Sequence, residues 1–128
     1  MDVRGLDRVV NLLAEFLDVQ SRRAQVVASN LANADTPGYQ AQELDFAQYL
    51  KDASQEALTP HSANNPSLLK NSPRLMPQTG LASGLDGNNV DAGHEMATLS
   101  EVGMSYLGGT GLLQARLRTL RSAIREGR

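Results

Sequence analysis

Two runs of residues with apolar members every three or four positions, one near each end of the chain, constrain its fold more than any other feature. The first run consists of Leu6, Val10, Leu13, Leu17, Gln20, Ala24, Val27 and Leu31. The second consists of Met96, Leu99, Gly103, Tyr106, Thr110, Leu113, Leu117, Leu120 and Ile124. An alternation of three and four places each run on one helix face, as in coiled coils. The pattern therefore predicts two long amphipathic helices that pack through these faces.

The sequence after the predicted N-terminal helix, residues 1–35, indicates where that helix ends. Pro37 disfavours helical backbone at Thr36, and the pair Pro37 and Gly38 suits the two central positions of a type II turn. Gly38 then supplies the positive φ that this turn requires. We therefore expect the helix to stop near Ala34 or Asp35.

The predicted C-terminal helix, residues 90–126, has capping residues at its start but glycines in its middle that lower helix stability. Asn89 or Asp91 can cap its first turn. Within the helix, each glycine costs about 1 kcal/mol relative to alanine. These glycines are Gly103, Gly108, Gly109 and Gly111. At Gly108, Gly109 and Gly111, either the free helix frays and bends, or the glycines permit close approach of another helix.

The segment between the helices shows no sustained hydrophobic period. Residues 36–52 are expected to form a turn and a short ordered segment, in which 45–51 suit either a helix or a strand. Residues 53–89, rich in proline, glycine, serine and asparagine, predict a long flexible loop. The fold expected over residues 1–128 is one all-α unit. Its long terminal helices form a coiled-coil-like antiparallel hairpin, joined by a poorly structured middle segment.

Composition excludes several classes of function. Cysteine is absent, which removes disulfides, thiolate zinc sites and cysteine nucleophiles. A net charge of -2 gives no global attraction to nucleic acid, so no nucleic-acid partner is expected. No window approaches the roughly 18 consecutive apolar residues of a membrane-spanning helix, so no direct membrane insertion is expected. The charged N-terminus lacks the apolar stretch of a cleaved signal peptide.

Residue types that often carry chemistry have simpler explanations in this chain. His61 and His94 each lack a second nearby ligand, so no metal site is expected. Asp91 and Glu95 could serve acid–base chemistry, but capping and the helix dipole explain them better. The C-terminal arginines suit a solvated helix end or a subunit contact better than a phosphate or lipid site. They are Arg116, Arg118, Arg121, Arg125 and Arg128. We predict no catalytic, cofactor-binding or metal-binding residues.

The segment 28–39, Ala-Ser-Asn-Leu-Ala-Asn-Ala-Asp-Thr-Pro-Gly-Tyr, resembles the signature of the bacterial flagellar axial proteins of the rod, hook and hook-associated family. In that family the signature reads approximately ANxxNxxTPGY. The matching residues are Asn30, Asn33, Thr36, Pro37, Gly38 and Tyr39. From their chemistry, the Asn30 and Asn33 amides are expected to bond carbonyls left unpaired at the helix end. The Tyr39 ring is expected to cover the turn while its hydroxyl finds a partner.

Three further segments, 42–46, 59–61 and 86–96, resemble the minimal proximal rod subunits of this family, of which two have similar length. The resemblance implies a non-enzymatic structural subunit, exported unfolded through the flagellar type III apparatus without a cleaved signal. It implies assembly through the terminal helices into a helical tube across the periplasm. The implied partners are copies of the chain, other rod subunits and the adaptor between rod and MS ring, with no cofactor. Either proximal subunit fits. A type III secretion needle or chaperone-like hairpin would share the two runs but not the helix ending.

Overall fold

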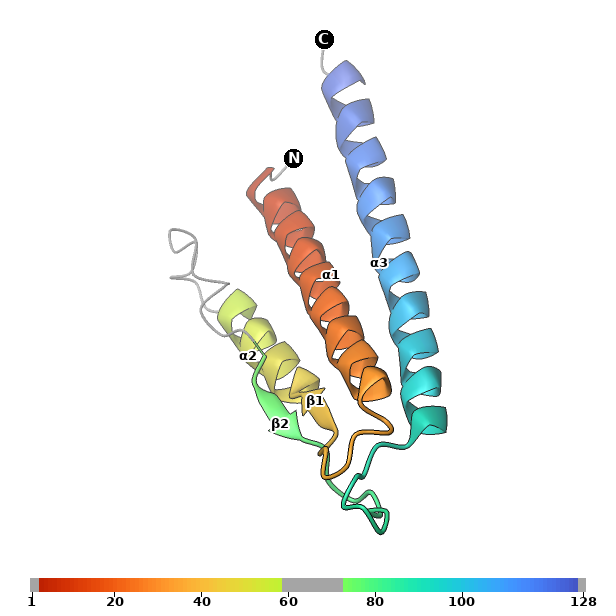
Figure 1. Ribbon diagram of the computed structural model, residues 1–128. Coiled ribbons are helices and arrows are strands. Elements are labelled where there is room, and N and C mark those ends of the chain that lie inside the picture. Colours follow the sequence, from red (N-terminus) through yellow and green to blue (C-terminus); the bar gives the residue numbers. More distant parts are fainter. Residues whose placement is uncertain (1–2, 59–72, 127–128) are drawn as a thin grey trace.

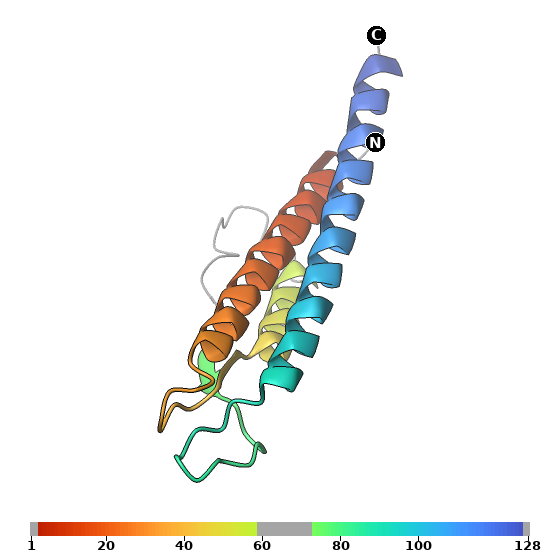
Figure 2. The same ribbon diagram turned by 45° about the vertical axis from the view of Figure 1, so that its right-hand side comes forward.

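The structure is a computed structural model that describes residues 3–58 and 73–126. Its helices are α1 (Val3–Ala32), α2 (Phe46–Leu58) and α3 (Ala92–Glu126), and its strands are β1 (Gln42–Leu44) and β2 (Leu75–Pro77). Helices α1 and α3 lie side by side and run in opposite directions, while the strands lie near the C-terminal end of α1 (Figures 1 and 2). The predicted mostly helical architecture with long, antiparallel terminal helices is confirmed.

The end of α1 follows the predicted turn chemistry. Helix α1 ends at Ala32, two residues before the earlier of the two predicted stops. The Tyr39 amide donates to the Thr36 carbonyl over 3.2 Å, and Gly38 has a φ of 73°. A hydrogen bond across four residues with positive φ at the third position defines a type II turn, so that prediction is confirmed.

The starts of α2 and α3 are both capped by aspartate. In α3, the Asp91 carboxylate accepts a hydrogen bond from the His94 amide over 3.1 Å, which selects Asp91 from the two predicted caps. In α2, the Asp45 carboxylate accepts from the Gln48 amide over 3.1 Å. This cap favours a helix after Asp45, and the structure has one where the sequence suits a helix or a strand equally.

Two elements reach into the range 53–89, which the sequence predicts to be a loop. Helix α2 continues to Leu58, and β2 pairs antiparallel with β1, placing Gln42 opposite Pro77 and Leu44 opposite Leu75. Three-residue strands are too short to show a hydrophobic alternation, which explains why the sequence pattern does not reveal them. The rest of the predicted loop, residues 59–72, lies outside the described residues.

The face of α3 that packs on α1 is one residue out of step with the predicted run. The buried positions are Glu95, Val102 and Gly109, which are spaced by seven, whereas Met96 is 63% exposed. A Cβ atom at Gly109 would lie 2.9 Å from Leu17 Cδ2, so the absence of a side chain lets the helices approach closely. Gly109 is therefore a point of close contact on the face of α3 that turns inward.

Helix α3 continues through its glycines without a break. At Gly109, the contact with α1 fits the close-approach explanation. At Gly103, Gly108 and Gly111, an added Cβ would meet no atom within 4 Å, so this contact does not account for them.

A second layer covers α1 on the side of α2 and the strands. The rings of Phe16 and Phe46 lie 6.3 Å apart with an interplanar angle of 59°, and Tyr49 is buried near Glu15. Burial, followed by the negative charges of Glu15 and Asp18, raises the pKa of Tyr49 above its usual value. Helix α1 therefore has one face against α3 and another against α2.

Candidate functional site

The six motif residues lie in a polar junction, defined here as the segments 29–42 and 84–91, where the end of α1 meets the loop leading into α3. Asn30 is fully buried, at 0% exposure. The Asn30 Oδ1 atom accepts from the Gln42 amide over 3.0 Å and from the Tyr39 hydroxyl over 3.3 Å. Its Nδ2 atom donates to the Gln42 carbonyl over 2.8 Å. Asn30 therefore pairs with the backbone of β1, and not with the helix-end carbonyls expected for it.

Asn33 bonds within the end of α1, but to the Ser29 carbonyl, which also accepts from the Asn33 backbone amide over 3.2 Å and is not one of the unpaired carbonyls expected. Its Nδ2 atom donates to the Ser29 carbonyl over 2.8 Å. The Thr36 hydroxyl donates to Asn33 Oδ1 over 3.2 Å, which connects the last helical turn to the following type II turn. These short-range hydrogen bonds fix the direction in which the chain leaves the helix.

Asn88 completes the end of α1 from the opposite half of the sequence. Its Nδ2 group donates to the carbonyls of Asn33, Ala34 and Thr36 over 2.9, 2.9 and 2.8 Å. The Asn88 Oδ1 atom accepts from the Val90 amide over 2.7 Å. A single amide therefore supplies donors to the Ala34 carbonyl and to the Asn33 and Thr36 carbonyls, which also accept from backbone amides in the turn. Sequence reasoning missed this role, because the segment that contains Asn88 was identified only by resemblance.

Asn89 and the backbone tie the two loops together. The Asn89 Oδ1 atom accepts from the amide of fully buried Ala41 over 2.6 Å. The Asn89 amide donates to the Tyr39 carbonyl over 3.3 Å, and the Gly38 amide donates to the Asp86 carbonyl over 2.9 Å. Asn89, the alternative cap for α3, thus binds the segment after α1 instead.

The chemistry of this junction is structural. Its buried side-chain partners are amides and a tyrosine hydroxyl, which hold backbone in place. Within residues 3–58 and 73–126, no three His, Cys, Asp or Glu side chains are grouped so that they could hold a metal ion. His94 is exposed, and His61 lies outside the described residues. What the junction can do is fix α1 relative to α3.

The predicted subunit-packing residues divide between buried and exposed positions. Val27 is buried, while the half-buried members are Val10, Leu13, Leu17, Ala24, Leu31, Leu113 and Leu120. The exposed members are Met96, Leu99, Tyr106, Leu117 and Ile124, all on α3. The side chain of Leu6 lies outside the described residues. Helix α3 therefore presents a row of apolar side chains that α1 does not cover.

The pair of long helices, the internal junction and the uncovered apolar row together define a class, a helical structural protein whose terminal helices offer surfaces for assembly. The sequence profile of the family described as "Flagella basal body rod protein" matches residues 17–40, which include the end of α1 and the motif. Over 133 residues, the chain is 32% identical to "Flagellar basal body rod protein FlgB" of Salmonella typhimurium, covering 95% of this chain and 96% of that protein. The chain belongs to the family of flagellar basal body rod proteins, and within it to the FlgB proteins.

Two further relatives agree with this family. The FlgB protein of Escherichia coli K12 is 31% identical over 137 residues, covering 95% of this chain and 96% of the relative. That of Yersinia enterocolitica is 27% identical over 135 residues, covering 95% of this chain and 97% of the relative. The likeness thus extends over both terminal helices, and the family is one of structural rod proteins. Within the part of the chain that the structure describes, no helix combines the length and apolar character needed to cross a bilayer.

Proposed function

We propose that this chain is a structural subunit of the proximal rod that joins its neighbours through the outer face of α3 and the adjoining surface of α1. The observation that carries the proposal is the exposed apolar row on α3, which includes Met96 at 63% and Ile124 at 70% exposure. Apolar side chains that recur along one helix face and lack an intramolecular partner are typical of protein interaction surfaces.

The different properties of the junction and of the apolar row support this role. The junction pairs its polar groups within one chain and holds α1 against α3, which gives the helices a fixed relative position. The apolar row lies outside that internal contact. A rod subunit needs both properties, because a rigid shape transmits torque and a free surface joins neighbours.

The proposed partners are copies of the same chain, other rod subunits and the adaptor between rod and MS ring. The proposed location is the periplasmic rod of the basal body, reached unfolded through the flagellar type III apparatus. Membership of the rod family and a full-length match to FlgB proteins support this placement.

Leu117→Asp tests the assembly surface. Leu117 is 41% exposed, so the isolated variant is expected to keep the far-UV circular dichroism spectrum of the parent chain. In cells that lack the parent gene, we expect the variant to abolish swimming and rod formation, because assembly would bury an unpaired charge. Swimming assays and the yield of isolated basal bodies measure the effect.

Thr119→Asp is the matched control, because it adds the same charge at an exposed position on the same helix, on the face opposite Leu117. It is expected to support swimming. Val27→Asp provides the opposite comparison, since Val27 is buried and its replacement should unfold the isolated chain as well. Normal swimming and rod yield with Leu117→Asp would refute the proposed surface.

A further inference from the structure

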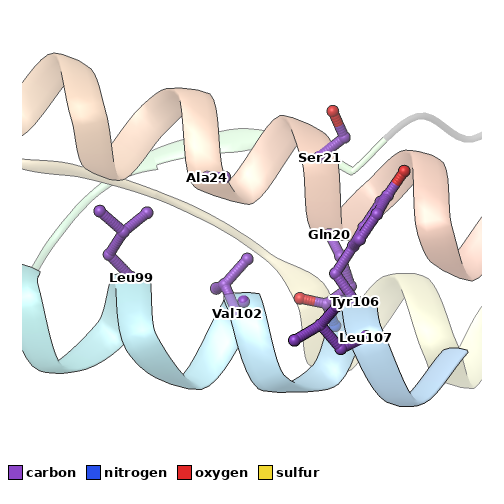
Figure 3. A pocket seen from close by; sticks show the side chains of 8 residues that line it. Gln20, Ser21, Ala24, Leu99, Val102, Tyr106 and Leu107 are labelled. Carbon is purple, nitrogen blue, oxygen red and sulfur yellow. The ribbon is translucent and has the colours of Figure 1, made fainter. Parts of the chain in front are cut away.

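A groove of about 420 Å³ runs between α1 and α3 on one side of the helix pair (Figure 3). Val102 and Gln20 are each 2% exposed and lie deep in it, whereas Leu107 is exposed and lies at its rim. The lining residues from α1 are Gln20, Ser21 and Ala24, and those from α3 are Leu99, Val102, Gly103, Tyr106 and Leu107. Small residues and apolar edges give the groove a shape that suits the side chains of a third helix.

Gln20 places in this groove a hydrogen-bond acceptor that has no donor in the described part of the chain. Its Oε1 atom is buried and accepts no hydrogen bond within the described residues. In Figure 3 the Gln20 side chain extends from α1 toward α3, into the space between Val102 and Tyr106. An unpaired buried amide oxygen costs about 1–3 kcal/mol, so a partner that brings a donor is stabilised. The occupant must therefore supply apolar side chains and at least one hydrogen-bond donor.

The last turns of α3 carry both of these features. Helix α3 projects beyond the first turn of α1 in both views (Figures 1 and 2), and Leu117 and Ile124 are exposed. Arg121 follows Leu117 by four positions and precedes Ile124 by three, so the three side chains share one helix face. Arg121 and Ile124 also line a common hollow. This face thus presents a guanidinium donor between two apolar side chains.

A chain cannot fill its own groove with this segment. Arg121 lies 15 residues beyond Tyr106 along the same straight helix, as their numbers give, which corresponds to about 22 Å. A flexible arginine side chain does not span that length. Arg121 can therefore reach this groove only from another molecule.

We propose that residues 117–124 of a second copy lie in this groove, with Leu117 and Ile124 against Leu99 and Leu107 and with Arg121 donating to Gln20 Oε1. The inference rests on the proposed function, because it names the copy-to-copy contact within the rod. Groove and inserted segment are different surfaces, so the contact is heterologous and repeats from one copy to the next. An open helical assembly requires a contact of this kind.

The absence of cysteine makes a crosslinking test direct. A chain that carries both Ser21→Cys and Ile124→Cys is produced in cells that lack the parent gene. Basal bodies are then isolated from these cells and oxidised. Within one molecule, position 124 lies 18 residues beyond Tyr106, or about 27 Å, far outside disulfide range. We expect a dimer whose linked peptides contain positions 21 and 124, identified by mass spectrometry, and we expect none with either variant alone. Thr119→Cys, on another face of α3, is the control that should not link to position 21.

Gln20→Met then tests the hydrogen bond, because it keeps the length of the side chain and removes the unpaired oxygen. We expect the isolated variant to melt at or above the temperature of the parent chain, while the yield of the 21–124 dimer falls severalfold. An unchanged dimer yield would overturn the role of Gln20. A link between two copies of position 21, or between position 21 and a different protein, would overturn the proposed occupant. If wild-type chain enters basal bodies but no 21–124 link forms, this inference fails alone; if wild-type chain is absent from basal bodies, the proposed function fails.

Discussion

The junction and the outer face of α3 differ in how far contacts within the chain satisfy their side chains. In the junction, Asn30, Asn88 and Asn89 pair buried polar groups with backbone of the same chain. On the outer face of α3, Met96 and Ile124 remain largely exposed, and the neighbouring groove contains the unpaired oxygen of Gln20. The polar groups of the junction thus find their partners within the chain, whereas the apolar side chains on the outer face of α3 are left available to other molecules.

Within the junction, the largest effect on the free chain is expected at Asn88. Asn88→Ala leaves the carbonyls of Asn33, Ala34 and Thr36 without their shared donor, at an expected loss of about 2–3 kcal/mol in unfolding free energy. Asn88→Asp should lose more, because it sets a carboxylate against the same three oxygens. Urea unfolding followed by circular dichroism measures both changes.

Gln40→Ala is the control for Asn88. The Gln40 side chain donates one hydrogen bond to the Gly87 carbonyl in the same junction, but the residue is exposed and water can replace the contact. Its loss should cost well under 1 kcal/mol. Equal effects of Gln40→Ala and Asn88→Ala would show that the junction does not depend on the buried amide.

A smaller effect should separate Gly109 from its neighbour Gly108. Both substitutions by alanine improve helix propensity by about 1 kcal/mol. At Gly108 nothing lies within 4 Å of the added Cβ, so the isolated chain should gain that amount. At Gly109 the Cβ would lie 2.9 Å from Leu17 Cδ2 and 3.1 Å from Phe16 Cδ1, and overpacking should cancel or reverse the gain. Thermal melts of the two variants compare them directly.

Hydrogen exchange tests the close contact at Gly109 more directly. If Gly109 is the point of closest helix contact, the amides around it are protected in the parent chain and lose protection in Gly109→Ala. A Gly109→Ala variant that gains as much stability as Gly108→Ala would argue against close packing at this position and in favour of local fraying.

The smallest effect concerns Tyr49, which joins α2 to α1. Burial and the carboxylates of Glu15 and Asp18 raise its pKa above the usual 10.0, so the folded chain holds the phenolic proton more tightly than the unfolded chain. Stability should therefore fall as pH rises above about 10, and Tyr49→Phe should lessen this dependence. Urea midpoints between pH 8 and 11 test the sign. An identical pH profile for Tyr49→Phe would exclude Tyr49 as the cause.

The sequence could predict those features whose causes are local. Repeats of three and four residues indicated both long helices, and Pro37 with Gly38 indicated the type II turn that follows α1. The inward face of α3 was not predictable from apolar periodicity, because apolar residues occupy several faces and the inward one includes Gly109, which has no side chain, and the charged Glu95. The pairing of β1 with β2 was also hidden, since each strand has only three residues.

The candidate site shows the same limit. The direction of the chain after α1 followed from the motif, whereas Asn30 proved to bind β1 and Asn88 proved to cap α1. Both of these contacts depend on how segments distant in the sequence meet in space. Side-chain chemistry gives the capacity of an asparagine to bond backbone, but not the identity of the backbone that it meets.

The position of Asn88 in the chain also sets an order of events. Its hydrogen bonds to the end of α1 span 52 to 55 residues. Whenever the polypeptide advances with its N-terminus first, α1 comes out long before the amide that completes its last turn, and water occupies those carbonyls in the interval. Closing so long a loop carries an entropic cost that contacts within one helix do not have. The hydrogen bonds that join the end of α1 to the loop before α3 can therefore form only after residue 88 is present.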